Sequence, residues 1–227
     1  MNLQAQTNKV DTTFNKIKSF TFTDVQKFTD GFRFGIHLSP TIGSFTAVDT
    51  LDSEGAKTRL SLGIILDKYL GPQQRYAFST GLSIMNKGGK LQTLGDVQLE
   101  SVEQSLGFGR EIDLKIRYWE IPLLLRMRTN TIQEKFVGYG HFGWVTGFRG
   151  KARGDVAGIE GANDIKFNKD VKFFNFSLSY GFGVEYKLGE ESTAMVGLAF
   201  NTGLMNAMKN VERADVNHVA LQIGIFY

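Results

Sequence analysis

Three histidines, His37, His141 and His218, are the side chains of this sequence best suited to proton transfer or metal binding. A nucleophilic enzyme would pair one of them with a serine and usually with a carboxylate. No local motif places such groups together, and the histidines lie too far apart in the sequence to have the spacing of metal ligands. We therefore expect no catalytic residue, no metal and no cofactor, and we keep an enzyme that modifies lipid A as an alternative.

Composition and glycine spacing argue against other classes of site. Cysteine is absent, which removes disulfides and thiol metal sites and argues against a cysteine nucleophile. The formal net charge is +3, and the basic residues are too scattered for a nucleic-acid interface. The glycines of 107–109 and 140–143 resemble nucleotide-binding loops only superficially, because neither segment lies in a βαβ unit.

The last segment of the chain, 218–227, alternates strictly between two kinds of side chain. One face carries Val219, Leu221, Ile223, Ile225 and Tyr227. Period-two alternation indicates a β-strand with one face against an apolar medium and the other toward a polar or tightly packed interior. A final strand that ends on an aromatic residue is typical of bacterial outer-membrane barrels.

Earlier segments of the chain repeat this alternation. The predicted strands are 31–42, 57–67, 75–85, 112–128, 135–149, 171–188, 192–204 and 218–227. The first, third, fifth and seventh connections are long and the others short, as in outer-membrane barrels with long external loops and short periplasmic turns. The alternation changes phase once, between Trp119 and Pro122, and we attribute this change to a β-bulge in the fourth strand.

We therefore predict an all-β fold, an eight-stranded antiparallel transmembrane β-barrel over residues 31–227 with a short N-terminal periplasmic arm over residues 1–30. No run of 18 apolar residues indicates a membrane helix, but a barrel needs apolar residues only at every second position. An even number of strands places both termini in the periplasm. A soluble ligand-binding barrel is the alternative, and it would point its apolar face inward.

The interior of so narrow a barrel is expected to be filled by side chains. Inward-facing charges there must be paired, because an unpaired buried charge is costly. The predicted polar network of the lumen comprises Arg33, His37, Arg59, Arg75, Glu120, Arg126, Glu185 and Lys187. The alternative is a lumen site for a small ligand or a proton. The predicted aromatic belt, where the wall meets lipid head groups, comprises Trp119, Trp144, Tyr180, Tyr186 and Tyr227.

One motif points to a known family. The segment 118–126, Tyr-Trp-Glu-Ile-Pro-Leu-Leu-Leu-Arg, resembles the Leu-Glu-Ile-Pro-Leu-Leu-Leu-Lys strand of the PorT-type outer-membrane β-barrel family of Bacteroidetes. The segments 31–36, 78–83 and 180–185 agree with it, and so does the aromatic C-terminus. The resemblance covers about 31–227 and implies an outer-membrane barrel. The founding member takes part in type IX secretion, so the resemblance also implies a link to secretion.

These observations together predict a bacterial outer-membrane protein with a filled lumen. We expect a non-enzymatic structural, assembly or accessory component of an envelope complex, related to type IX secretion, with a lipid A-modifying enzyme or a narrow channel as alternatives. The expected partners are outer-membrane lipid and lipopolysaccharide, and the barrel-assembly machinery through the C-terminal strand. An envelope protein could bind loops 86–110 and 150–170 or the arm 1–30, because long loops are usually functional or disordered.

Overall fold

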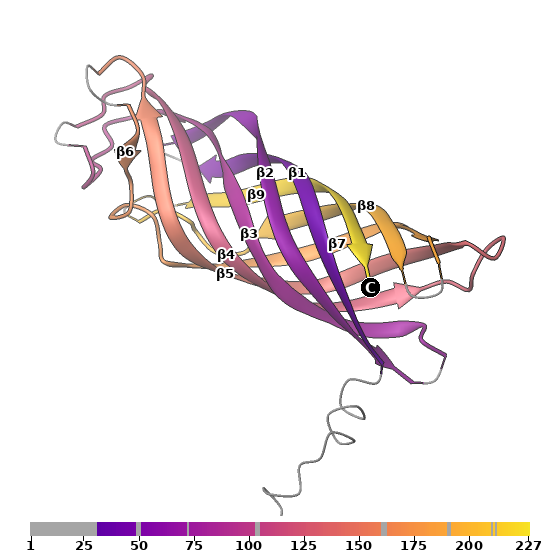
Figure 1. Cartoon of the computed structure of the whole chain (residues 1–227). Coiled ribbons are helices and arrows are strands. Elements are labelled where there is room, and N and C mark those ends of the chain that lie inside the picture. Colours follow the sequence, from indigo (N-terminus) through magenta and orange to yellow (C-terminus); the bar gives the residue numbers. More distant parts are fainter. Residues whose placement is uncertain are drawn as a thin grey trace, which may run out of the picture. The chain divides into compact units, whose positions relative to one another are not determined.

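Strands make up all the regular secondary structure of the described residues in this computed structural model (Figure 1). The structure describes residues 31–48, 51–71, 73–102, 105–159, 163–189, 192–209, 211 and 213–227. The strands are β1 (Phe32–Val48), β2 (Leu51–Leu70), β3 (Tyr76–Thr93), β4 (Glu111–Arg128), β5 (Phe136–Val156), β6 (Ile165–Lys166), β7 (Phe174–Lys187), β8 (Thr193–Gly203) and β9 (Arg213–Phe226). The predicted arm, 1–30, lies outside the described residues. Within them, no helix is long and apolar enough to cross a membrane.

Eight of the strands form a closed antiparallel ring. Its order is β1, β2, β3, β4, β5, β7, β8 and β9, and β9 returns to pair with β1 from Gly35↔Phe226 to Val48↔Arg213. The ring has no free edge, so backbone groups that face lipid are bonded to a neighbouring strand. The short β6 lies outside the ring and pairs only with β5. The predicted eight-stranded antiparallel barrel is confirmed.

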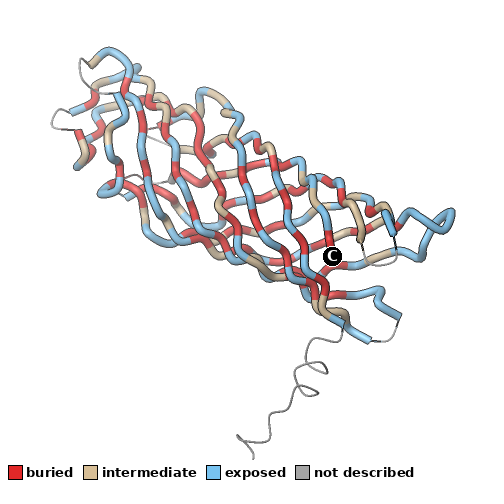
Figure 2. Tube along the Cα trace, viewed as in Figure 1, coloured by how far each residue is buried: buried red, intermediate tan, exposed pale blue. Residues whose placement is uncertain are grey.

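Buried and exposed residues alternate along the strands of the ring (Figure 2), and many of the exposed, outward-facing residues are large and apolar. They include Phe34, Ile36, Leu38, Leu62, Ile64, Phe78, Leu82, Leu123, Leu125, Phe142, Phe182, Val196, Leu221 and Ile223. A soluble barrel would not expose so large an apolar surface. Along β4 and β5 this surface ends at Trp119 and Phe148.

Several strands continue past the ends that the apolar pattern predicts. β1 ends at Val48 instead of 42, β2 begins at Leu51 instead of 57, β3 ends at Thr93 instead of 85, β5 ends at Val156 instead of 149, and β9 begins at Arg213 instead of 218. The predicted first connection, 43–56, therefore consists almost wholly of β1 and β2. The prediction was wrong here because it followed the apolar outward face, whereas the hydrogen-bonded ladder continues beyond it. β5 has 21 residues, about twice the number that crosses a membrane.

The interior of these extensions is apolar. The connection after β3 and the connection after β5 fold back into it. The buried side chains that fill this end, called here the apolar plug, are Phe45, Leu51, Leu91, Val97, Leu99, Val102, Leu106, Ile112, Leu114, Ile116, Tyr118, Ala152, Val156, Phe167, Val171, Ala207, Met208, Val211, Ala214 and Val216. We call this the plug end and the opposite end, where β2–β3, β4–β5 and β7–β8 are joined, the short-turn end. Outside the hydrocarbon the usual rule returns, with apolar side chains inward and charges outward.

The predicted bulge in the fourth strand is wrong. β4 alternates without a break, because Ile116, Tyr118, Glu120 and Arg126 are all buried. The inward residues of β4 change in chemistry along the strand. They are apolar in the plug, and they include the charged Glu120 and Arg126 nearer the short-turn end. The extra residue lies opposite, in β5, where the pairing passes from Arg117↔Lys151 to Tyr118↔Arg149 and skips Gly150.

The bulge at Gly150 changes which positions of β5 face inward. Buried positions of β5 are odd-numbered up to Gly147 and even-numbered from Ala152. Because the bulge absorbs one residue, both halves keep the same side inward. Phe142 and Trp144 face outward and Tyr139 faces inward.

We predict that Gly143→Ala destabilises the barrel by roughly 1–3 kcal/mol. A Cβ at Gly143 would lie 2.2 Å from the carbonyl oxygen of Leu123 on β4, so the two strands would have to separate. Gly140→Ala is the matched control, because its Cβ would meet nothing closer than the Gly181 oxygen at 3.6 Å. The measurement is the urea dependence of the folded fraction in detergent, followed by electrophoretic mobility without heating. Equal stability of the two variants would contradict the prediction.

Candidate functional site

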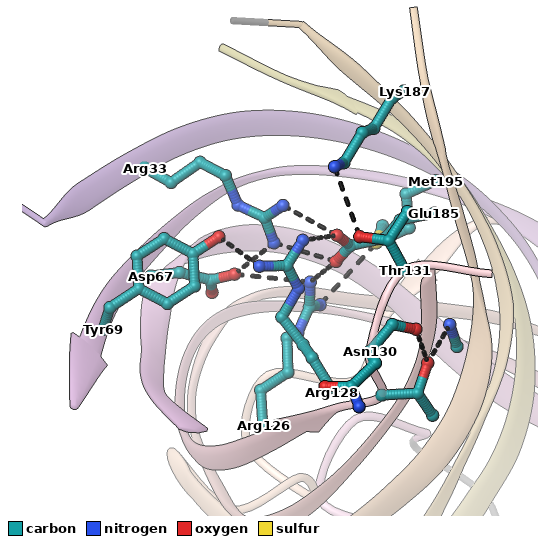
Figure 3. Close-up of polar contacts among 12 residues, drawn as sticks. Arg33, Asp67, Tyr69, Arg126, Arg128, Asn130, Thr131, Glu185, Lys187 and Met195 are labelled. Carbon is teal, nitrogen blue, oxygen red and sulfur yellow. Dashed lines mark hydrogen bonds and ion pairs between the residues drawn. The ribbon is translucent and has the colours of Figure 1, made fainter. Parts of the chain in front are cut away.

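A group of buried charges fills the lumen toward the short-turn end (Figure 3). Arg33 of β1 donates from Nη1 and Nη2 to the two carboxylate oxygens of Glu185 on β7, at 2.8 Å each. Its Nη2 also donates to Asp67 of β2 at 2.9 Å. The Glu185 and Asp67 side chains have no exposed surface. Paired charged hydrogen bonds of this kind are among the strongest available to a buried carboxylate.

Two further arginines of β4 converge on the same carboxylates. Arg128 donates to Glu185 at 2.7 Å and to the Tyr69 hydroxyl at 2.8 Å. Arg126 lies 3.3 Å from Glu185 and 3.4 Å from Asp67. We refer to Arg33, Asp67, Arg126, Arg128 and Glu185 as the ion cluster. It ties together four strands of the ring, β1, β2, β4 and β7.

The ion cluster holds three positive and two negative charges, and aromatic rings face the excess positive charge. The Arg33 guanidinium lies 3.7 Å from the ring centroid of Phe226. The Arg126 guanidinium lies 4.5 Å from that of Tyr139. Cations over aromatic faces are stabilised without a counterion, most of all when they are desolvated. The carboxylates compensate two of the three positive charges and the aromatic rings pack against the guanidiniums, as in a structural core.

A second buried ion pair lies nearer the plug. Lys87 of β3 and Glu120 of β4 are 2.6 Å apart, with 0% and 5% of their side chains exposed. The Lys87 ammonium is also 5.8 Å from the ring centroid of Tyr118, a member of the apolar plug. The pair therefore marks the boundary between the polar and apolar parts of the interior.

A cavity of about 60 Å³ separates the ion cluster from this pair. Its polar lining includes His37, His141, Ser39, Ser83, Glu120 and Arg126. The ring nitrogens of His37 lie 2.9 Å from Ser39 Oγ and 3.2 Å from Ser83 Oγ. Both ring nitrogens of His141 lack a hydrogen-bond partner among the described residues. The space is polar and large enough for a few bound waters, and far below the volume of a pocket for an organic substrate.

The cavity brings together side chains of the kinds found in catalytic sites. The contact between His37 and Ser83 is a base and a hydroxyl nucleophile within hydrogen-bond reach. The space beside this contact is the cavity of about 60 Å³. His218, also buried, has unpartnered ring nitrogens within the described part of the chain. No group of three or more histidine, aspartate or glutamate side chains there could hold a metal ion.

The residues predicted for the lumen network lie in several places. Arg33, Arg126 and Glu185 meet in the ion cluster, whereas His37 and Glu120 line the cavity. The remaining three lie outside the lumen network. Arg59 lies 3.2 Å from Asp113 in a groove at the plug end, Arg75 is exposed in a short turn, and Lys187 is exposed and donates to Thr131 Oγ1 at 3.3 Å. The prediction assigned these three residues to the lumen from the alternation alone. They lie near the ends of the predicted strands, where side chains reach solvent.

The sequence analysis did not predict four residues that take part in the buried ion pairs and hydrogen bonds of the lumen. These are Asp67, Tyr69, Lys87 and Arg128. Asp67 and Arg128 share the inward phase of neighbours that were recognised, so the sequence carried a signal for them. Lys87 and Tyr69 lie beyond the predicted ends of their strands and were assigned to connections. The belt residues all face outward. Trp119, Trp144, Tyr180 and Tyr227 are exposed and Tyr186 is half-buried, and their depth in a membrane stays a prediction.

We predict that Glu185→Gln destabilises the barrel by roughly 3–5 kcal/mol, the cost of breaking a buried ion pair. The change leaves three buried guanidiniums with Asp67 as their one carboxylate within the ion cluster. Lys187→Gln is the matched control two residues further along β7, because the Lys187 side chain is exposed and makes one hydrogen bond. Its expected effect is within about 0.5 kcal/mol. Urea titration of the folded fraction in detergent measures both, and similar midpoints would contradict the prediction.

Among solved structures, the chain is similar to the Neisserial surface protein A, NspA, with 13% identity, a TM-score of 0.48, and coverage of 85% of this chain and 95% of that chain. For Ail of Yersinia pestis the values are 13%, 0.41, 86% and 98%. For OprG of Pseudomonas aeruginosa they are 15%, 0.42, 87% and 95%. No curated protein sequence matches the chain.

A family model described as an outer membrane protein beta-barrel domain matches residues 4–211, most of the chain. The match agrees with the closed ring of strands, the apolar outer surface and the filled interior. Homologues of this kind lie in the bacterial outer membrane. The chain therefore belongs to the outer membrane protein β-barrel domain family.

Proposed function

We propose that the protein is a non-enzymatic structural, assembly or accessory component of an envelope complex, and that it acts through its surfaces. The observation that carries this proposal is the filled interior. The ion cluster fills the lumen near the short-turn end, and the apolar plug fills the other end. Among the described residues these two groups obstruct the lumen, so a partner would have to meet the outside of the barrel.

The proposed orientation places the short-turn end and both termini in the periplasm and the plug end outside the cell. Support comes from the lengths of the connections. The described turns at the short-turn end are brief, whereas the chain between Thr93 and Glu111 and between Val156 and Phe174 is long. Short periplasmic turns and long external connections are the rule for these barrels.

The external connections are the proposed contact region for an envelope partner. Parts of the predicted loops 86–110 and 150–170 are buried, since Leu106 and Phe167 belong to the plug. The remaining surface includes Phe108, whose side chain is 77% exposed. A secretion role of the type IX kind is proposed from the resemblance of segment 118–126 to PorT-type barrels. The arm 1–30 stays a second proposed contact.

The C-terminal residues Phe226 and Tyr227 are proposed to be recognised by the barrel-assembly machinery. Their side chains lie in different surroundings. Phe226 is buried beneath the Arg33 guanidinium, whereas Tyr227 is 75% exposed at the rim. The backbone of Tyr227 still pairs with Phe34, at 2.7 and 3.2 Å. Tyr227 is thus the side chain available to a partner, and Phe226 serves the lumen.

The orientation can be tested on intact cells, because the chain has no cysteine to remove. We expect Gln98→Cys, exposed at the plug end, to react with a membrane-impermeant maleimide. Gln73→Cys, exposed in a short turn, should react only after the outer membrane is permeabilised. The measurement is the mass shift of the labelled protein. The reverse pattern would overturn the proposed orientation.

A second experiment tests whether the barrel is closed to ions. Wild-type protein inserted in planar bilayers should show no stepwise conductance, because the plug and the ion cluster obstruct the lumen independently. The variant Glu185→Gln, which loosens only the ion cluster, should stay equally silent. Stepwise conductance of the wild type would overturn the closed-barrel proposal.

The same protein, tagged and extracted in mild detergent, should retain another envelope protein. Phe108→Ser should reduce that retention without changing the folded fraction. A barrel that purifies alone from every mild detergent would remove the basis for the module proposal.

A further inference from the structure

Basic side chains gather on the outer surface of β4 and β5, immediately beyond the apolar face. A groove of about 360 Å³ is lined there by Arg59, Lys115, Arg117, Lys151 and Arg153. Three aspartates share the lining, Asp113, Asp155 and Asp164. The groove lies outside the barrel, so it is separate from the lumen and its cavity.

The strand register places like charges directly opposite one another. Lys115 pairs with Arg153 and Arg117 pairs with Lys151, and all four side chains are exposed on the same outward face. Directly opposed residues of antiparallel strands have Cβ atoms about 4.5–5.5 Å apart, and like charges in such pairs are destabilising. A block of four opposed cations therefore weakens the sheet unless an anion is bound between them.

The neighbouring carboxylates contact other groups, and one of them pairs with Arg153 of the block itself. Asp113 lies 2.8 Å from Lys57 and 3.2 Å from Arg59, both of which come from β2. Asp164 forms an ion pair with Arg153, and its backbone N–H donates to Asp155 at 2.7 Å.

Three cations of the block are consequently left without a counterion. Arg117 makes a hydrogen bond of 3.3 Å to the side chain of Asn86. The side chains of Lys115 and Lys151 have no hydrogen bond or ion pair within the described part of the chain. We call Lys115, Arg117 and Lys151 the open cations.

The groove borders the surface that faces lipid. Arg117 lies two residues from Trp119 on the same face of β4, a rise of about 7 Å. On β5, Lys151 follows Phe148 across the Gly150 bulge. The Trp119 indole nitrogen would lie 3.2 Å from a Cβ at Gly150, so the ring lies beside the bulge, between the apolar face and the open cations. Tryptophan is enriched where the hydrocarbon meets the head groups.

We propose that this groove binds the phosphate groups of lipid A, the membrane anchor of lipopolysaccharide, with the acyl chains along Trp119 and Phe148. Phosphate monoesters carry about −1.5 to −2 charges and accept several charged hydrogen bonds, which suits three open cations. Burying an anion there also relieves the opposed like charges. The choice of lipid rests on the proposed orientation, which puts the groove in the outer leaflet.

The test uses the full-length protein in nonionic detergent, with diphosphoryl lipid A as the probe and native mass spectrometry as the readout. The variant Lys115→Gln/Arg117→Gln/Lys151→Gln should lose affinity by about tenfold or more, since it removes several charged hydrogen bonds. The control Arg75→Gln/Lys135→Gln/Lys187→Gln makes the same change of net charge at exposed positions of the short-turn end. It should bind within about twofold of the wild type, as expected for charges beyond the reach of the site.

Each outcome decides the proposal. Unchanged binding by the triple variant at the groove, or an equal loss in the control, would overturn it. Equal retention of phosphatidylglycerol would show attraction to any anionic lipid and would also overturn it, as would complete displacement by inorganic phosphate. Binding in detergent does not depend on orientation, so a reversed maleimide pattern would overturn the proposed topology and leave this measurement intact.

Discussion

The structure depends on one constraint, that a strand in hydrocarbon must hydrogen-bond its backbone to another strand. A free edge would leave a row of unpaired N–H and C=O groups in lipid, each costing several kcal/mol. The sheet therefore has to close, and the pairing of β9 with β1 closes it. Closure fixes one face of every strand inward and the other outward. The other features of the molecule depend on what each of these two faces contacts.

The two faces meet different media at different heights. Within the membrane the outward residues are apolar and the inward residues include the ion cluster and the Lys87–Glu120 pair. Beyond Trp119 the arrangement inverts, with Lys115 and Arg117 outward and Ile116 inward. A single uninterrupted strand such as β4 thus serves both arrangements. This inversion of side-chain polarity, with no break in the backbone, lies where the membrane edge is proposed.

The proposed function lies on the outer surface, because the ion cluster and the plug fill much of the interior. What remains accessible is the outer surface: the external connections, the rim at Tyr227 and the basic groove of β4 and β5. The connections and the rim are proposed to contact proteins, and the groove is proposed to contact lipid. All three proposals are interactions with other components of the envelope.

The sequence by itself determined the class of fold, the number of strands and the facing of most residues, because period-two alternation is a local property that lipid enforces. It also pointed to Arg33, Arg126 and Glu185 as inward charges. The tertiary structure alone decided where strands end, since the ladder of β1, β3 and β5 continues after the apolar pattern stops. It also decided the partners of each charge. Which arginine meets Glu185, and that Lys115 opposes Arg153, depend on the stagger between strands distant in sequence, and no local pattern records that stagger.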